Sequence, residues 1–319
     1  MTTRIRPTTA EDVAAIAVWI EAEYPLPASL GRSLSTILLR LLVDEMLHGV
    51  AVERIDRAGD RLRLAAFGLS AFLREDVATA YLASPVPYIE LTLLDRVRRG
   101  ERPFLGYEEI AARNAVGGLT LLPLMWLQCS NDRADPETQE LLTTCQRSFL
   151  IQHRGYRLTR ILKETPAERA GAFASGGFRE VCRWLPGTPL PFGGVLAHER
   201  VVFEATRADF ELSFPSAGAV GQLFPYRPPV CGFTRAEQMI LSRALDHHTD
   251  LEIARQLALG EAAVAMRWRS IYSRIQALAP EVIGPKDDAE TKVRGQEKRR
   301  RALAYVAANP AELRPYAKH

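Results

Sequence analysis

Basic side chains are the residues whose type and position could do chemistry in this sequence. The last third of the chain, from residue 231, holds 15 Lys and Arg against 11 Asp and Glu, whereas the rest holds 26 against 27. Four basic residues run from Lys298 to Arg301, and Arg267, Arg269 and Arg274 lie close together. Ammonium and guanidinium groups bind phosphates, so the last third is expected to meet a polyanion. A basic run is also typical of a solvated helix face, and both interpretations of Lys298–Arg301 stay open.

Residue spacings typical of catalysis, metal binding or disulfides do not stand out. There is no Ser/His/Asp or paired-carboxylate pattern, and the four cysteines are far apart, without a Cys-x-x-Cys pair. We therefore expect no catalytic residue, no metal and no cofactor. His153 is expected to cap helix carbonyls rather than to catalyse, and His247-His248 to face solvent rather than to bind metal or sense pH. Cys129 and Cys182 are expected to be buried thiols rather than redox sensors.

Composition predicts a two-domain protein outside the membrane. The chain has 319 residues, of which 47% are hydrophobic and 25% charged, which is ordinary globular usage. Its longest apolar stretch, Leu119 to Leu127, is about half of the roughly 20 residues that a membrane helix needs. No apolar signal core follows Met1. We expect a cytoplasmic protein with no membrane partner.

Residues 1–185 alternate between helix and strand patterns, which predicts an α/β domain with a mixed sheet and helices. Pro123 implies a bulge or an edge in its strand, and Asp135 is expected to cap the helix after it. Strands are expected at 50–55 and 61–67, joined by a turn at 57–60 into a hairpin, and at 118–127, 157–163 and 178–185. Helices are expected from Thr8, at 29–48 with Gly49 as the end, over most of 74–115, at 136–153 and at 166–175.

A connector rich in proline and glycine is predicted at 186–230, with one possible strand at 199–205. Beyond it the pattern is entirely helical. Two capping boxes, Thr234 with Glu237 and Thr249 with Glu252, begin the first two helices, and a third helix is expected at 261–278. These helices predict a compact all-α helix-turn-helix domain over 231–284. A basic helical tail is expected at 285–319, with a helix at 295–308.

The helical segment resembles the LuxR-type, or GerE-type, DNA-binding domain. The family pattern L-T-x-R/A-E-x-x-[IV]-L is matched by Phe233–Leu241, and S-x-x-E-I-A-x-x-L by Thr249–Leu257. The closing T-V-x-x-H-x-x-x-I-x-x-K-L is matched in part by Ala263–Ile275. The core positions that the resemblance implies are Leu241, Ile253, Ala254, Leu257, Val264, Trp268, Ile271 and Ile275.

The resemblance implies a transcriptional regulator that binds double-stranded DNA as a homodimer. It places Ala265, Met266 and Arg269 at base edges, where only Arg269 can make a bidentate contact with guanine. The phosphate contacts that it implies are Thr249, Arg267, Arg274, Arg299 and Arg300. An adaptor whose helices bind protein instead of DNA is the alternative from another class.

The order of strands and helices over 1–185 resembles the GNAT acetyltransferase superfamily, and Phe173–Phe178 is similar to its Y-x-x-x-G-F ending. The family's acetyl-CoA loop, R/Q-x-x-G-x-G/A, falls on Gln128–Pro136, which lacks glycine and carries Asp132 and Asp135, both repulsive to phosphate. We therefore expect a domain without catalysis, not an enzyme, that senses a small-molecule effector or forms the dimer.

The main alternative is an active N-acetyltransferase fused to a DNA-binding module. An acyl-homoserine-lactone receptor fits less well, because Trp19 and Tyr24 lie far from the Asp-Pro at residue 135. A response-regulator receiver fits least, because the acidic pair that it needs after the first strand is missing.

Overall fold

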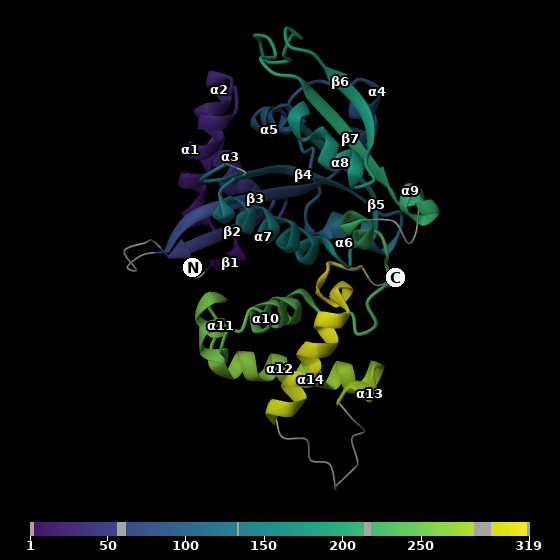
Figure 1. The fold of residues 1–319 in the computed structure, drawn as a ribbon. Helices are drawn as coiled ribbons and strands as arrows, with labels where there is room; N and C mark the ends of the chain where they lie inside the picture. Colours follow the sequence, from purple (N-terminus) through teal and green to yellow (C-terminus); the bar gives the residue numbers. More distant parts are fainter. Residues whose placement is uncertain (1–2, 56–61, 133, 214–217, 284–294, 318–319) are drawn as a thin grey trace.

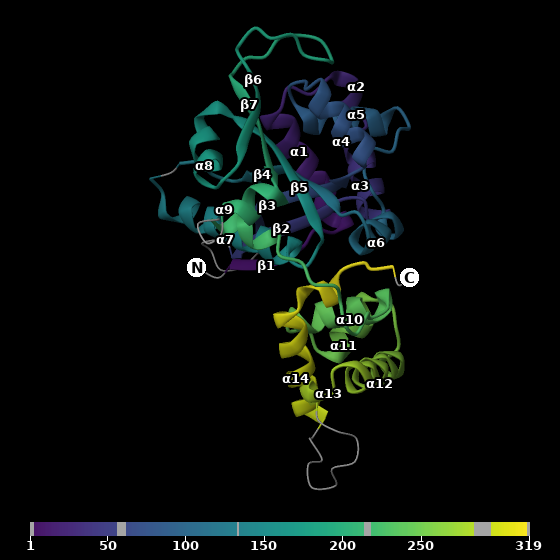
Figure 2. The ribbon, with the colours of Figure 1, turned by 90° about the vertical axis from the view of Figure 1, so that its right-hand side faces the viewer.

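The computed structural model describes residues 3–55, 62–132, 134–213, 218–283 and 295–317 (Figure 1). A seven-stranded sheet with helices on both faces forms the N-terminal unit, and a group of helices forms the C-terminal unit below it (Figures 1 and 2). The predicted α/β domain, with a mixed sheet and helices, is therefore confirmed. The expected turn at 57–60 lies outside the described residues.

The sheet has the strand order β1-β2-β3-β4-β5-β7-β6. All neighbours are antiparallel except β4 and β5, which run parallel. The strands are β1 (Thr3–Pro7), β2 (His48–Ile55), β3 (Leu62–Leu73), β4 (Leu119–Gln128), β5 (Leu158–Pro166), β6 (Arg179–Trp184) and β7 (Arg200–Thr206).

Two hydrophobic cores lie on opposite faces of this sheet. On one face, helices from the first hundred residues pack against β3, β4 and β5. They are α1 (Val13–Glu23), α2 (Ala28–Gly31), α3 (Leu34–Val43), α4 (Glu75–Ala83) and α5 (Ile89–Arg98). On the other face lie α6 (Tyr107–Ala115), α7 (Pro136–His153) and α9 (Arg207–Ser213). The short α8 (Ala170–Ser175) precedes β6.

One predicted helix is shorter than expected. The segment 29–48 forms α2 and α3, and α3 ends at Val43 instead of at Gly49. Glu45 takes a left-handed backbone with φ of 54°, which reverses the chain, and His48 and Gly49 already belong to β2. The helix prediction was wrong here because apolar Met46 and Leu47 continue the helical spacing by chance.

The expected connector contributes to the sheet. Its possible strand is β7, which lies between β5 and β6 and is almost fully buried. The 3-10 turn η3 (Ala219–Leu223) and Phe224 pack into the same core as Phe72 and Leu119. The N-terminal unit therefore extends to about residue 224 and does not end at residue 185.

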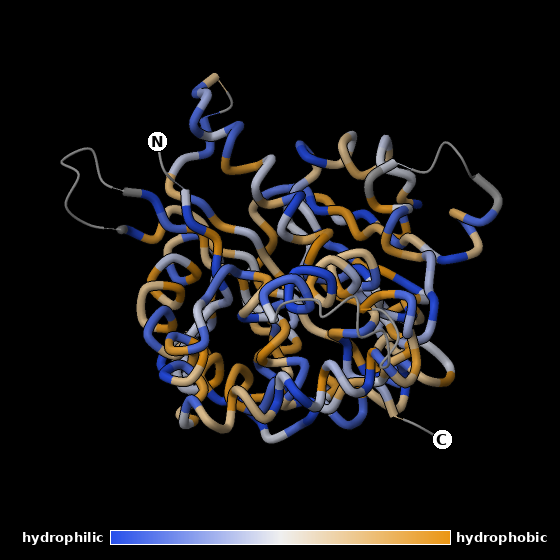
Figure 3. The backbone as a smooth tube through the Cα atoms, turned by 90° about the horizontal axis from the view of Figure 1, so that it is seen from below, coloured by the Kyte–Doolittle hydropathy of each residue, from blue (hydrophilic) through white to orange (hydrophobic). Residues whose placement is uncertain are grey.

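The C-terminal unit has its own core. Its helices are α10 (Arg235–Leu245), α11 (Asp250–Gln256), α12 (Glu261–Leu278), α13 (Pro280–Ile283) and α14 (Gly295–Ala308). Both expected capping boxes form, with Thr234 and Thr249 as N-caps. Hydrophobic and hydrophilic stretches alternate along the helices seen from this side of the molecule (Figure 3). Of the eight expected core residues seven are buried, and Leu257 is partly buried.

The segment 309–317, which includes the 3-10 turn η4 (Pro310–Leu313), joins the two units. Glu312 is buried and accepts from the amides of Val230, Cys231 and Gly232. Farther along, Pro315 O accepts from Asn114 Nδ2 on α6 at 2.9 Å. The helical unit is thus fastened to the sheet domain by main-chain contacts.

Candidate functional site

The parallel strands β4 and β5 pair at one end and then part. Their register joins Leu119, Thr120 and Leu121 of β4 to β5, and no pair of described residues joins them beyond Leu121 and Ile161. On its other side β4 carries a bulge, because Leu69 faces Met125 while Ser70 faces Pro123, which leaves Leu124 extra. The bulge expected from Pro123 is therefore confirmed, and it lies where the two strands separate.

Lys163 of β5 crosses this opening. Its Nζ donates to the main-chain oxygens of Pro123 and Leu124, both at 3.0 Å. Burial lowers the pKa of this ammonium, and it also raises the pKa of the nearby Cys145 thiol on α7 to about 12. Two groups therefore lie near the opening: the Lys163 ammonium, which donates to β4 carbonyls, and the protonated thiol of Cys145.

A buried charged cluster lies beside the opening, on the other face of β5. Glu164 accepts from the amides of Tyr88 and Ile89 at the start of α5, both at 2.8 Å. Arg200 of β7 donates to Glu164 and, at 2.9 Å, to Glu90 of α5. All three charged side chains are at most 8% exposed.

One carboxyl group of the cluster has a raised pKa. Burial and the Glu164 carboxylate raise the pKa of Glu90 to about 7, against the opposing effect of Arg200. Perturbed carboxylates of this kind are common at functional sites, although structural ion-pair networks also produce them. Sequence reasoning missed this cluster. Its one sequence signal was Glu164, a charge on the same strand face as the apolar Leu162.

The turn before α7 is capped by its own carboxylates. Asp135 accepts from the amide of Glu137 at 3.1 Å, and Asp132 accepts from the amide of Ala134 at 2.9 Å. These amides point at carboxylate oxygens, which leaves the turn negatively charged. The predicted cap of Asp135 is confirmed.

Of the histidines and cysteines singled out in the sequence, His153 has hydrogen-bond partners at both ring nitrogens. His153 is buried, with Nδ1 2.8 Å from Phe149 O and Nε2 2.8 Å from Ser70 Oγ. This geometry matches the expected contact with helix carbonyls. Cys129 is exposed, contrary to expectation, because it lies just past the end of β4. In the described part of the chain, no group of His, Cys, Asp and Glu could hold a metal, and no helix is long and apolar enough to cross a bilayer.

On α12, the residues expected to face DNA lie on the solvent side. Ala265, Met266, Arg267 and Arg269 are exposed. Trp268, between them, is buried and donates to Asp250 at 3.1 Å. This outer face is therefore free to meet a partner.

The expected phosphate contacts are mostly held within the protein. Arg274 pairs with the buried Glu237 at 3.1 Å. Arg299 pairs with Asp250 at 2.7 Å and stacks over Trp268. The remaining two also have local partners: Arg300 pairs with Glu297, and the Thr249 hydroxyl bonds to Glu252.

Neither a protein-family model nor a curated protein matches the chain. Solved structures that resemble it include NAA60 from Arabidopsis thaliana in complex with acetyl-CoA, with 12% identity, a TM-score of 0.36, and coverage of 64% of this chain and 98% of that one. A protein described as an acetyltransferase of the GNAT family from Desulfovibrio desulfuricans has 10% identity and a TM-score of 0.35, covering 64% and 99%. Mutant forms of the spermidine/spermine N-acetyltransferase SpeG from Vibrio cholerae have 10% identity and a TM-score of 0.35, covering 66% and 97%.

These neighbours correct one expectation. The missing glycine motif suggested that the protein is not an enzyme, whereas the solved structures that it resembles include a spermidine/spermine N-acetyltransferase and a protein described as an acetyltransferase of the GNAT family. The residues around the opening fit the two parts of acetyl-CoA unequally. Beyond Leu121, β4 has main-chain groups that pair with no described β5 main chain and could bind an extended arm. The turn before α7 does not fit a pyrophosphate, because Asp132 and Asp135 already occupy its amides.

Proposed function

We propose that this chain joins an N-acetyltransferase of the GNAT type to a helix-turn-helix module that binds double-stranded DNA. The observation that carries the first part is the opening between β4 and β5, with the buried Glu90, Glu164 and Arg200 beside it.

The opening suits a ligand with amide groups. Backbone groups in a sheet need hydrogen-bond partners, and β4 has no β5 partner beyond Leu121 within the described part of the chain. An extended arm can bind along such a strand edge in the way that an added strand does. Lys163 would have to release Pro123 O and Leu124 O for a donor to reach them.

The charged cluster suits the amine that receives the acyl group. An ammonium must lose a proton before its nitrogen can attack a carbonyl, and a carboxylate with a pKa of about 7 can take that proton at neutral pH. We assign this role to Glu90, which is 1% exposed, so a group packed over it would have to move for the amine to reach it. Arg200 and Glu164 hold Glu90 in place and set its proton affinity.

Acetyl transfer is tested with acetyl-CoA and a panel of amines, with release of the free thiol as the readout. We expect Glu90→Gln to lower kcat by about 100-fold or more, as is usual for loss of a general base, with the melting temperature measured alongside. Glu101→Gln removes an exposed carboxylate and serves as the control. If acetyl-CoA neither binds nor reacts in the wild-type protein, the acetyltransferase part of the proposal is wrong.

DNA binding is supported by the exposed face of α12, which carries Arg267 and Arg269 on either side of the buried Trp268. A homodimer would place two such helices about one DNA turn, or roughly 34 Å, apart. Gel shifts are expected to show relaxed sequence preference for Arg269→Ala, and a weaker, sequence-independent loss with a shallower salt slope for Arg267→Ala. Arg98→Ala, on α5, is the control. Identical binding by all four proteins would contradict the DNA-reading role.

A further inference from the structure

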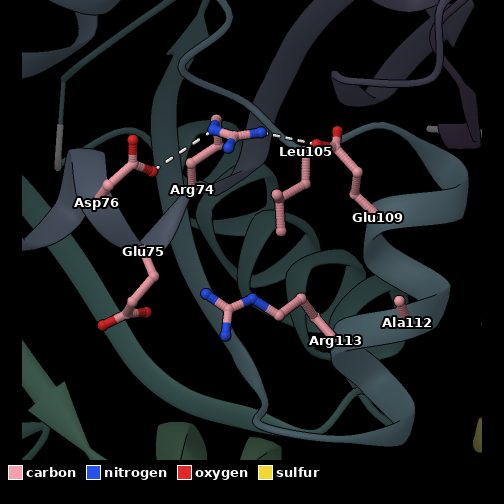
Figure 4. Close-up of a pocket in the computed structure, with 7 residues that line it drawn as sticks. All are labelled: Arg74, Glu75, Asp76, Leu105, Glu109, Ala112 and Arg113. Carbon is pink, nitrogen blue, oxygen red and sulfur yellow. Dashed lines mark hydrogen bonds and ion pairs between the residues drawn. The ribbon is translucent and has the colours of Figure 1, made fainter.

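A surface cavity of about 460 Å³ lies between the start of α4 and one side of α6. Leu105 and Ala112 form its apolar part, and five charged residues surround them (Figure 4). The charged residues are Arg74, Glu75, Asp76, Glu109 and Arg113. The cavity belongs neither to the opening between β4 and β5 nor to α12.

The two arginines of the cavity differ in whether they form ion pairs. Arg74 already pairs with Glu109 at 2.7 Å and with Asp76 at 3.5 Å. Arg113 has no ion pair with any described residue, and its guanidinium points into the cavity on the same side as Glu75 (Figure 4). Arg113 is therefore the cation that can bind an added anion, and a carboxylate matches its planar set of donors.

The charges of Arg113 and Glu75 indicate which charges the ligand should carry. The Glu75 carboxylate lies on the same side of the cavity as Arg113, where it would repel a doubly charged phosphate. Glu75 keeps an exposed carboxylate, 44% accessible, although it pairs with Arg160 at 3.3 Å. A ligand with one carboxylate and one ammonium would satisfy Arg113 and Glu75 without adding net charge.

We propose that this cavity binds a small zwitterion, an α-amino acid with an apolar side chain. Its carboxylate binds Arg113, its ammonium faces Glu75, and its side chain covers Leu105 and Ala112. The volume exceeds that of one amino acid and lies in the usual range for small-molecule sites.

Helix α6 connects this cavity to the helical unit. Its residues Glu109, Ala112 and Arg113 line the cavity. On another side of the same helix, Tyr107 donates to Gln238 of α10 at 3.2 Å, and Ala111 O accepts from the amide of Ala317 at 3.1 Å. A ligand on Arg113 therefore binds to the helix on which the C-terminal unit is docked.

Binding is tested by calorimetry on the full chain with L-leucine, 4-methylpentanoate, 3-methylbutylamine and inorganic phosphate. The second probe lacks the ammonium of leucine, and the third lacks its carboxylate. We expect L-leucine to bind about tenfold more tightly than either single-charge probe, and phosphate not to compete with it. Arg113→Gln should weaken leucine about tenfold or more, and Arg98→Gln, on α5 outside the cavity, should leave it unchanged.

Three results would overturn the proposal. They are no heat from leucine at millimolar concentration, equal affinity for leucine and 4-methylpentanoate, and unchanged leucine binding by Arg113→Gln. If Arg113→Gln does not fold, Arg113→Lys keeps the charge but removes the planar pair of donors, and it should still weaken leucine binding.

Discussion

Arg200 of β7 donates from Nη2 to Oε1 of Glu90 on α5 at 2.9 Å, and both side chains are buried. Arg200→Met is expected to lower the free energy of unfolding by about 3–5 kcal/mol, because it leaves the Glu90 and Glu164 carboxylates buried without their cation. Urea unfolding followed by circular dichroism measures the change.

Arg183→Met is the matched control for that experiment. Arg183 is also a sheet arginine with two carboxylate partners, Glu180 and Glu199, but all three are exposed enough for water to screen them. We therefore expect Arg183→Met to unfold at nearly the same urea concentration as the wild-type protein. Similar losses from both variants would show that burial of the Arg200 cluster does not matter.

Asp132→Asn with Asp135→Asn is expected to raise the affinity for acetyl-CoA about fivefold. Asparagine keeps the capping hydrogen bonds, whereas two negative charges that repel the pyrophosphate disappear. Acetyl-pantetheine, which has no pyrophosphate, is the matched probe and should bind both proteins equally. If the affinities for acetyl-CoA and acetyl-pantetheine rise equally, the two aspartates do not act by repelling the pyrophosphate.

Stability is expected to fall on the acid side because of two histidines. Burial lowers the pKa of His48 to about 4 and that of His153 to about 3, against an ordinary value of 6.5. The unfolded chain therefore takes up protons first as the pH falls below 6.5, and each histidine costs about 1.4 kcal/mol per pH unit until its folded pKa is reached.

His48→Phe tests this pH dependence. It removes one titrating ring, whose Nε2 has no partner among the described residues, and keeps an aromatic contact with Phe72. The slope of unfolding free energy between pH 6 and pH 4.5 should become shallower by about 1.4 kcal/mol per unit. His198→Phe, at an exposed position, should keep the wild-type slope.

Arg274→Ala is expected to destabilise the helical unit by about 1–3 kcal/mol, because Glu237 is 1% exposed and loses its cation. Arg269→Ala removes an exposed arginine from the same helix and should stay within about 0.5 kcal/mol of wild type. Thermal unfolding of the full chain compares them. Equal stability of the two variants would mean that the Arg274–Glu237 pair contributes nothing.

Gly155→Ala is expected to disturb the docking of the 309–317 segment. Gly155 has a φ of +86°, and a Cβ there would lie 2.4 Å from the amide nitrogen of Ala311. Gly187 also has a positive φ, of +92°, but no atom lies within 4 Å of the Cβ position. Gly187→Ala should therefore cost only the backbone strain of about 1 kcal/mol, and Gly155→Ala more. Equal melting temperatures would exclude the predicted clash.

Local signals in the sequence predicted local structure well. Asp135-Pro136 sets the start of α7, the Thr234 and Thr249 boxes set α10 and α11, and Pro123 marks the bulge. Each depends on hydrogen bonds within a few residues, which the residue types already determine.

The charged cluster could not be predicted because its members come from α5, β5 and β7. Glu90 and Arg200 are 110 positions apart, and only the insertion of β7 beside β5 brings them together. The same limit applies to Arg274, whose pairing with Glu237 depends on how α10 and α12 cross. Periodicity identifies which side of a helix is apolar but not which neighbour that side meets.

The chemistry of Pro123 explains why β4 and β5 stay apart at this point in the sheet. A proline has no amide hydrogen to donate, so strand pairing cannot simply be extended through this position to close the sheet. What fills the gap and what keeps it open are thus separate properties. Substituting Lys163 would change which group lies between β4 and β5. Pro123 would still keep the two strands apart for any molecule that binds there.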